Sequence, residues 1–132
     1  RKWRPLPLST VELQKLAARH LRMGSEQTMN LAEGLYNEGF LSYPRTETDR
    51  FSMTDGELGQ LVQEQTGHPT WGAYALQLTQ GGYRRPREGR NDDKAHPPIH
   101  PTKLAAALVG DRARLYELVA RHFVACCSED AL

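Results

Sequence analysis

The sequence has 132 residues, about the size of one domain, and its 25% charged and 39% hydrophobic content is typical of a soluble globular protein. No apolar run approaches the roughly 18 residues that a membrane span requires, and the arginine-rich start lacks the apolar core of a signal peptide. The net charge of +1 does not by itself indicate a nucleic-acid-binding protein, although arginines gather in "RKWR" at the start and in "YRRPREGR" at 83–90.

Two helices are predicted near the start, over residues 8–24 and 25–39. Ser9 and Glu12 have the spacing of a capping box, and Ser25 is expected to cap the second helix. Gly24 and Gly39 are expected to end the two helices. Apolar residues recur at helical spacing on one face of each helix: Leu13, Leu16, Ala17 and Leu21, then Met29, Ala32, Leu35 and Tyr36. The short link between them is compatible with a helix-turn-helix, which is also common in helical bundles that bind no DNA.

The rest of the chain is predicted to be mainly helical with little sheet. Pro44 favours an extended conformation for residues 40–43, and three prolines forbid a helix over 96–102. A loop rich in Gly, Arg and Asp is expected over 81–94. Helices are predicted over 53–67, with Thr54 and Glu57 as a capping box, over 69–82, over 102–110, with Thr102 as its cap, and over 111–131.

Two adjacent cysteines, Cys126 and Cys127, lie in the last predicted helix. Neighbouring cysteines rarely form a disulfide, and their spacing matches no metal-binding motif. They therefore indicate packing residues in a reducing compartment. The chain stops just after this strong helical pattern, so residues 1–132 are interpreted as a single domain from a larger protein.

The stretch "GFLSYPRTET", residues 39–48, combines a tyrosine and an arginine on a backbone stiffened by Pro44. A free tyrosine has a pKa near 10, so only about one in a thousand is ionised at neutral pH, and a nucleophilic tyrosine needs a nearby positive charge or base. In an extended segment Tyr43 and Arg45 project to the same side. Arginine also binds phosphate through its planar fork, which favours attack on a phosphodiester over attack on a carbonyl.

The second notable stretch is "DDKAHPPIHPT", residues 92–102. Its prolines exclude the helical pair of histidines that binds zinc, so His96 and His100 are either ordinary loop residues or one of them is held rigidly against a phosphate. Asp92 and Asp93 are the only nearby carboxylates, and the sequence places no third oxygen ligand beside them. We expect no metal site in this chain.

These two stretches, in this order, resemble the type IA DNA topoisomerases, and most closely the topoisomerase III alpha branch. The segments "LPLSTVELQKLA", "TMNLAEGLYNEGFLSYPRTET", "WGAYA", "AHPPIHPTK" and "LYELVARHFVACCSEDA" share the resemblance, which therefore spans nearly the whole chain. The resemblance implies that this is the tyrosine-bearing gate domain, a helical domain with a helix-turn-helix of the catabolite-activator type.

The resemblance also implies roles for individual residues. Tyr43 attacks one DNA strand, Arg45 contacts the scissile phosphate, and alignment on the alanine of "KAHPP" places His96 rather than His100 near the active site. Residues expected to contact DNA are Thr46, Lys94, Arg84 and Arg85.

The family's acidic Toprim domain is missing from these residues. The resemblance implies that it holds Mg²⁺, so this chain alone is expected to be inactive and to bind no metal itself. The implied partners are single-stranded DNA, a RecQ-family helicase and an OB-fold accessory protein, with no membrane. The implied location is the nucleus, with mitochondria as a second compartment.

Two other functions remain open from the residues alone. A non-catalytic helix-turn-helix module would bind DNA through its helices and arginines and use Tyr43 for packing. A strand transferase like the tyrosine recombinases would also combine Tyr, Arg and His, but it would become attached to a 3′ phosphate.

Overall fold

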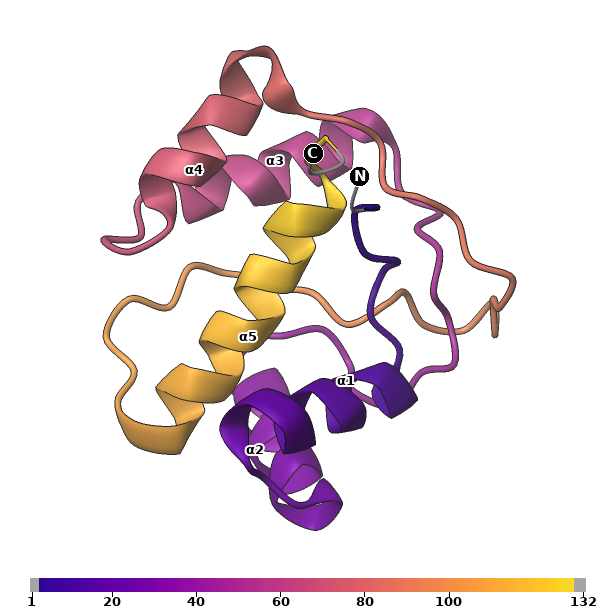
Figure 1. Cartoon of the computed structure of the whole chain (residues 1–132), viewed down its shortest axis with the longest axis vertical. Coiled ribbons are helices and arrows are strands. Elements are labelled where there is room, and N and C mark those ends of the chain that lie inside the picture. Colours follow the sequence, from indigo (N-terminus) through magenta and orange to yellow (C-terminus); the bar gives the residue numbers. More distant parts are fainter. Residues whose placement is uncertain (1–2, 130–132) are drawn as a thin grey trace.

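Helices joined by long extended segments form the structure over residues 3–129, the part of the chain that this computed structural model describes. Figure 1 shows α1 and α2 at one end of the molecule, α3 and α4 at the other, and α5 running between them. In chain order the helical elements are α1 (Thr10–Leu16), the π-helical turn η1 (Ala17–Leu21), α2 (Ser25–Asn37), α3 (Asp55–Gln65), α4 (Gly72–Gln77), the π-helical turn η2 (Leu78–Gly82) and α5 (Gly110–Cys126). The predicted mainly helical class is confirmed.

The first two helices lie close to their predicted positions. Ser9 caps α1 by accepting a hydrogen bond from the backbone N–H of Glu12 at 3.4 Å. The helix widens into the π-helical turn η1 and ends at Arg22, whose φ of 56° is left-handed, before the predicted Gly24. Gly24, rather than the predicted Ser25, occupies the N-cap of α2. Residues 22–24 thus form the short turn of the helix-turn-helix arrangement.

The capping box predicted for α3 is present. Thr54 Oγ1 accepts the N–H of Glu57 at 3.1 Å, and Glu57 Oε1 accepts the N–H of Thr54 at 3.0 Å. Satisfying both donors at the helix start stabilises α3 despite its two internal glycines. The predicted helix over 69–82 begins later, at Gly72, and kinks at Gly81, whose φ is 110°.

Helix α5 joins two hydrophobic cores. Near its start it packs into a core with α1 and α2, and near its end into a core with α3 and α4 (Figure 1). Its residues in the first core are Leu115, Tyr116, Val119 and Ala120, and those in the second are Phe123 and Val124, followed by Cys127 just past the end of the helix. The helix ends at Cys126, earlier than the predicted 131. Both cysteines are free and buried, as expected for packing residues.

The helix predicted over 102–110 is wrong, because α5 begins only at Gly110 and the preceding residues are irregular. Thr102 does not cap a helix: its hydroxyl donates to the carbonyl of Gly39 at 2.8 Å. The carbonyl of Lys103 accepts from the Tyr116 hydroxyl at 2.7 Å. These tertiary hydrogen bonds outweigh the helical preference of the alanines. Of the residues predicted to line one face of the second helix, Met29, Ala32 and Leu35 are buried, whereas Tyr36 is 42% exposed.

Extended segments take the place of a sheet. Over residues 3–129 the only β-pairings are two isolated antiparallel bridges, Leu8 with Ile99 and Leu41 with Pro101. The first bridge places the start of the chain beside Ile99. The second, together with backbone hydrogen bonds from Ser42 to His100 and from Asp49 to Asn91, brings the segments 40–49 and 91–101 side by side. Among the described helices, none has the length and apolar character needed to cross a membrane.

Candidate active site

Tyr43 lies where the two extended segments meet, and its neighbour Ser42 fixes the pairing. The N–H of Ser42 donates to the carbonyl of His100 at 3.0 Å, and the N–H of His100 donates back to Ser42 Oγ at 2.9 Å. Both residues are buried. The backbone on the N-terminal side of Tyr43 is therefore held rigidly against the proline-rich segment.

Thr10, at the start of α1, holds the backbone on the other side. Its hydroxyl donates to the carbonyl of Pro44 at 2.6 Å and accepts the N–H of Thr46 at 2.8 Å. Its own N–H donates to the carbonyl of Thr46 at 3.0 Å. These bonds bracket Arg45, so the path of the chain from Tyr43 to Thr46 is set by contacts at both ends.

The ring of Tyr43 lies between two other rings. It meets His96 with ring centroids 4.4 Å apart and planes tilted by 38°, and it meets Tyr36 edge-on at 5.3 Å. Tyr43 is half-buried, whereas His96 and Tyr36 are exposed. The phenol is therefore held in place by aromatic contacts on a surface that a large substrate can reach.

Arg45 contacts the same face of α2 as Tyr43. One guanidinium nitrogen, Nη2, lies 2.6 Å from Glu33 Oε1, and 56% of the arginine side chain is exposed. Glu33 and Tyr36 are three residues apart on α2 and so lie on one helix face. Tyr43 and Arg45 accordingly project to the same side, as the extended segment predicts.

His96 and His100 have different environments. His96 is exposed beside Tyr43, but only 4% of His100 is exposed, and its ring packs near Phe51 and Phe123, with ring centroids 5.6 and 6.0 Å away. The Nδ1–H of His100 donates to the carbonyl of Pro98 at 2.7 Å. Burial lowers the pKa of His100, so it is neutral at neutral pH.

The carboxylate of Asp93 connects the two motifs. One oxygen, Oδ1, accepts the N–H groups of Ala95 and His96, each at 2.9 Å. The other, Oδ2, accepts the hydroxyl of Thr46 at 3.0 Å and the N–H of Glu47 at 3.4 Å. Hydrogen bonds from the backbone of His96 and then Ala95 hold the pKa of Asp93 well below its usual range.

The four predicted DNA contacts fall into two groups. Thr46 and Lys94 lie beside the three contacting rings of Tyr36, Tyr43 and His96. Lys94 and His96 line the same hollow of about 410 Å³. Arg84 pairs with Glu129 at 2.5 Å and Arg85 with Asp55 at 3.1 Å, beyond the far end of α5. The structure therefore brings Tyr43, Arg45, His96, Thr46 and Lys94 together and holds Arg84 and Arg85 elsewhere.

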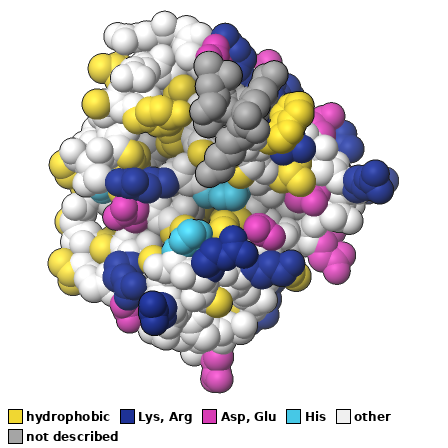
Figure 2. All heavy atoms as spheres, viewed as in Figure 1, with side chains coloured by type: hydrophobic (Ala, Val, Ile, Leu, Met, Phe, Trp, Pro, Cys, Tyr) yellow, Lys and Arg dark blue, Asp and Glu magenta, His cyan; other side chains and the backbone are white. Residues whose placement is uncertain are grey.

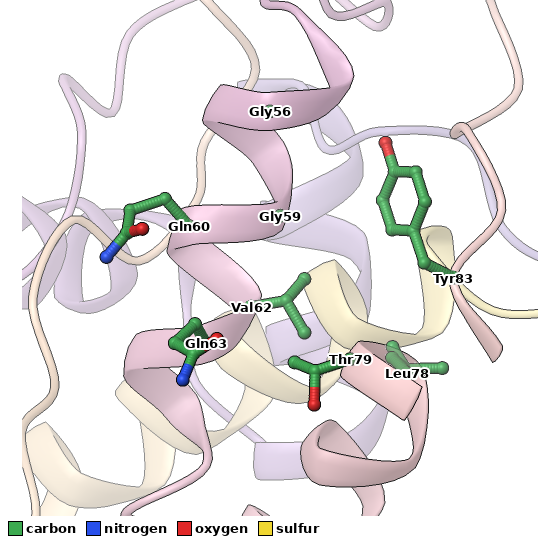
Figure 3. Close-up of a pocket in the computed structure, with 8 residues that line it drawn as sticks. All are labelled: Gly56, Gly59, Gln60, Val62, Gln63, Leu78, Thr79 and Tyr83. Carbon is green, nitrogen blue, oxygen red and sulfur yellow. The ribbon is translucent and has the colours of Figure 1, made fainter. Parts of the chain in front are cut away.

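Another groove, between α3 and η2, carries no comparable chemistry (Figure 3). It measures about 380 Å³, and two glycines, Gly56 and Gly59, leave the surface of α3 open there. Its one titratable lining group is the Tyr83 hydroxyl, which donates to Asp55 at 2.8 Å. Burial, and then this hydrogen bond, raise the pKa of Tyr83, so its phenol stays protonated.

Charge on the surface is mixed. On the face shown in Figure 2, histidine side chains lie near the centre, and Lys and Arg side chains alternate with Asp and Glu around them. This agrees with the net charge of +1. Any binding of DNA must therefore depend on local groups more than on a uniformly basic surface.

The residues described here do not fit a metal ion. Between residues 3 and 129, no three His, Cys, Asp or Glu side chains form a group able to hold one. Asp93 is already committed, because both of its oxygens accept hydrogen bonds from N–H or O–H groups. Asp92 Oδ1 likewise accepts the N–H of Lys94 at 2.8 Å.

Four residues of this site escaped the sequence predictions: Thr10, Glu33, Tyr36 and Asp93. Thr10 and Glu33 have ordinary helical surroundings in the sequence, which carry no signal of a tertiary contact. Tyr36 has helical spacing and so resembled a core residue. Asp93 could have been found, since an aspartate before a turn commonly accepts backbone N–H groups of the residues that follow it.

The fold and sequence match known proteins. The sequence model of the family described as "DNA topoisomerase" matches residues 1–132. The chain is 56% identical over 131 residues to DNA topoisomerase 3-alpha of Drosophila melanogaster, covering 99% of this chain and 10% of that protein. It is 55% identical over 130 residues to DNA topoisomerase 3-alpha of Homo sapiens, covering 98% of this chain and 13% of that protein.

A more distant relative is DNA topoisomerase 3 of Schizosaccharomyces pombe, 50% identical over 133 residues that cover 98% of this chain and 21% of the relative. Among solved structures, full-length topoisomerase I from Thermotoga maritima superposes with a TM-score of 0.67 at 23% identity, over 98% of this chain and 21% of that one. The structural likeness concerns the fold alone. The chain spans only 10% to 21% of the length of these relatives.

Proposed function

This chain belongs to the DNA topoisomerase family, and we propose that it is the nucleophile-bearing domain of a type IA enzyme of the topoisomerase III alpha branch. The whole enzyme cleaves one DNA strand, passes DNA through the break and reseals it. The observation that carries the proposal is the pairing of the Tyr43 and His96 rings at 4.4 Å, with Arg45 on the same side of the molecule.

The reaction is a transesterification. The Tyr43 oxygen forms a bond to phosphorus and loses its proton, and the bond from phosphorus to the 3′ oxygen breaks. The tyrosine becomes linked to the 5′ phosphate, and a proton is delivered to the leaving 3′ oxygen. One phosphodiester replaces another, so resealing requires no ATP.

Arg45 is proposed to bind the non-bridging oxygens of the scissile phosphate. Its guanidinium has five N–H donors, and only Nη2 is engaged by Glu33. The other donors can therefore form the planar, two-pronged contact that arginine makes with phosphate. In other enzymes, removing one donor to a developing negative charge slows the reaction by about 10²–10³-fold.

His96 is proposed to act on the same phosphate. Its ring is exposed, and the hydrogen bonds of Asp93 to the backbone at 95 and 96 keep it beside Tyr43. A histidine near neutral pH can donate a hydrogen bond to a phosphate oxygen or transfer a proton. Lys94 is proposed to contact the adjoining DNA, and Arg84 and Arg85 to contact it farther away. Thr46, predicted as a fourth contact, is only 5% exposed and its hydroxyl donates to Asp93, so it supports the site from inside the fold.

Enzymes of this type commonly depend on Mg²⁺, and we propose that an acidic Toprim domain elsewhere in the protein holds it. Between residues 3 and 129 no three His, Cys, Asp or Glu side chains gather to hold it, and both oxygens of Asp93 already accept hydrogen bonds. When bound, the ion would supply positive charge near the phosphate. This chain by itself should therefore lack cleavage activity.

Trapping of the covalent intermediate tests the proposal. The native protein that contains this chain is incubated with single-stranded DNA labelled at its 3′ end and then denatured. A labelled protein band is expected, and Tyr43→Phe should abolish it while changing the free energy of unfolding by only about 1 kcal/mol. An adduct on 5′-labelled DNA instead would indicate a recombinase-like 3′ linkage. DNA binding without any adduct would indicate a non-catalytic helix-turn-helix module.

The proposed partners follow from the same family. They are single-stranded DNA, a RecQ-family helicase and an OB-fold accessory protein, and the proposed location is the nucleus, with mitochondria as a second compartment. Affinity capture of the native protein from fractionated cells tests both points. Recovery without a helicase, or from neither organelle, would contradict them.

A further inference from the structure

We propose that Asp93 is a positioning residue for strand cleavage: its carboxylate fixes His96 beside Tyr43 by joining the segment of His96 to the segment of Tyr43. This inference rests on the proposed function. Asp93 itself has no contact with Tyr43 among those described, so its effect on the reaction passes through the backbone and the ring of His96.

The two oxygens of Asp93 have separate tasks. Oδ1 accepts the N–H groups of Ala95 and His96 at 2.9 Å and so shapes the turn that presents the histidine. Oδ2 accepts the Thr46 hydroxyl at 3.0 Å, in the segment that carries Tyr43. One carboxylate therefore binds both motifs at once, across 47 positions of sequence.

A second set of hydrogen bonds joins the same two segments. The N–H of Asp93 donates to Thr48 Oγ1 at 3.0 Å, and the N–H of Thr48 donates to Thr46 Oγ1 at 3.1 Å. Thr46 and Thr48 are buried, at 5% and 1% exposure. Because the threonines cannot turn to solvent, their positions and that of the carboxylate are mutually fixed.

The arrangement requires an ionised carboxylate. Four donors point at its oxygens, and a carboxylate only accepts. An asparagine would keep one oxygen for the turn but would place an N–H₂ group against the N–H of Glu47. The lowered pKa of Asp93 ensures that the charged form is present throughout the neutral range.

The neighbouring Asp92 provides a matched control. Its Oδ1 accepts only the N–H of Lys94, two residues on, at 2.8 Å. Asp92→Asn changes the net charge as Asp93→Asn does and leaves the link between the segments intact. A purely electrostatic effect of either carboxylate on DNA would appear in both variants, whereas a positioning effect would appear in Asp93→Asn alone.

The experiment is a double-mutant cycle on the native protein, measured by single-turnover cleavage of a 3′-labelled single-stranded oligonucleotide. Asp93→Asn should slow cleavage by about tenfold while its Kd for the oligonucleotide changes by less than about threefold. In a His96→Ala background the same change should slow cleavage by less than about twofold, because the ring that Asp93 positions is already gone. Asp92→Asn should cleave at the normal rate.

Several outcomes would overturn the inference: normal cleavage by Asp93→Asn, equal slowing by Asp92→Asn, or slowing by Asp93→Asn that is as large without His96 as with it. Thermal unfolding is measured on every variant. If Asp93→Asn does not fold, Thr46→Val is the second variant: it removes the hydroxyl that donates to Oδ2 and that accepts the N–H of Thr48, and it leaves the Oδ1 bonds to Ala95 and His96 in place. The same cycle applies to it. Failure of the proposed function is distinct, since the unaltered protein would then form no Tyr43 adduct.

Discussion

Replacing His96 or His100 by alanine is expected to produce opposite defects, although the two residues belong to one proline-rich segment. His96 is exposed, so His96→Ala should change the free energy of unfolding by no more than about 0.5 kcal/mol. Cleavage should nevertheless slow by at least about tenfold, which corresponds to about 1.4 kcal/mol of activation free energy. The defect lies in the chemical step, so extra enzyme should not rescue it.

His100→Ala removes a ring of which only 4% is exposed, near Phe51 and Phe123, together with its hydrogen bond to the carbonyl of Pro98. Creating such a cavity and leaving that carbonyl only its longer bond from the Ser42 hydroxyl, at 3.3 Å, should destabilise the chain by about 2–4 kcal/mol. For a domain of this size the Tm should fall by roughly 10 °C. At assay temperatures well below this lowered Tm the variant is folded and should cleave at close to the normal rate.

The assay is single-turnover cleavage of a 3′-labelled single-stranded oligonucleotide by the native protein, with thermal unfolding of the same variants measured alongside. If folded His100→Ala proves slower than His96→Ala, the roles are reversed. If neither variant slows cleavage, the proline-rich segment is structural, and the phosphate is bound by Arg45 and by groups outside this chain.

Three further predictions concern the site and the stability of the fold. Arg45→Lys keeps the charge but loses the planar fork, so single-turnover cleavage should fall by at least about tenfold while single-strand affinity changes little. Burial lowers the pKa of both His100 and His122 below the unfolded value of about 6.5, so the unfolded chain gains protons first on acidification. Denaturant unfolding should show stability falling from pH 7 to pH 5, by at most about 1.4 kcal/mol per pH unit for each histidine. Gln65→Leu leaves the indole N–H of Trp71, now bonded to Gln65 Oε1 at 2.8 Å, without an acceptor and should destabilise the fold by about 1–3 kcal/mol in the same assay.

Each of these three predictions has a result that would contradict it, and the last two also have a control variant. An unchanged cleavage rate in Arg45→Lys would remove the guanidinium from the transition state. For the pH dependence, His122→Gln should reduce the slope, and stability that is flat or rises on acidification would contradict the assignment. Gln63→Leu, on the exposed side of α3, should be nearly neutral, and an equal loss from both glutamine variants would show that the buried hydrogen bond is unimportant.

Local sequence patterns predicted the helices well where the decisive interactions are local. The capping box of Thr54 and Glu57 and the stop at Gly39, whose φ is 84°, depend on residues a few positions apart. The predicted helix over 102–110 failed because its hydrogen bonds go to residues distant in sequence, as with Thr102 and Gly39. Propensity carries no information about such partners.

In the candidate site, too, local motifs were predictable and contacts between distant parts of the sequence were not. The sequence motifs pointed to Tyr43, Arg45 and His96, but nothing in them shows that Glu33 holds the guanidinium or that Thr10 brackets Arg45. Those contacts depend on how α1 and α2 pack against the extended segment. The separation of exposed His96 from buried His100 likewise depends on the second core, which forms from distant parts of the chain.

The pairing of the extended segments has a consequence for the order in which the chain acquires structure. Ser42 bonds to His100 across 58 positions, and Thr46 bonds to Asp93 across 47. During synthesis on the ribosome, residues 40–48 can therefore reach their final positions only after residues 93–100 have been made. The local contacts of α3 and α4 can form earlier. A nascent or truncated chain that lacks residues 93–100 would contain Tyr43 without the hydrogen bonds that hold its segment in place. The contact between Tyr43 and His96 can thus form only after most of this chain has been made.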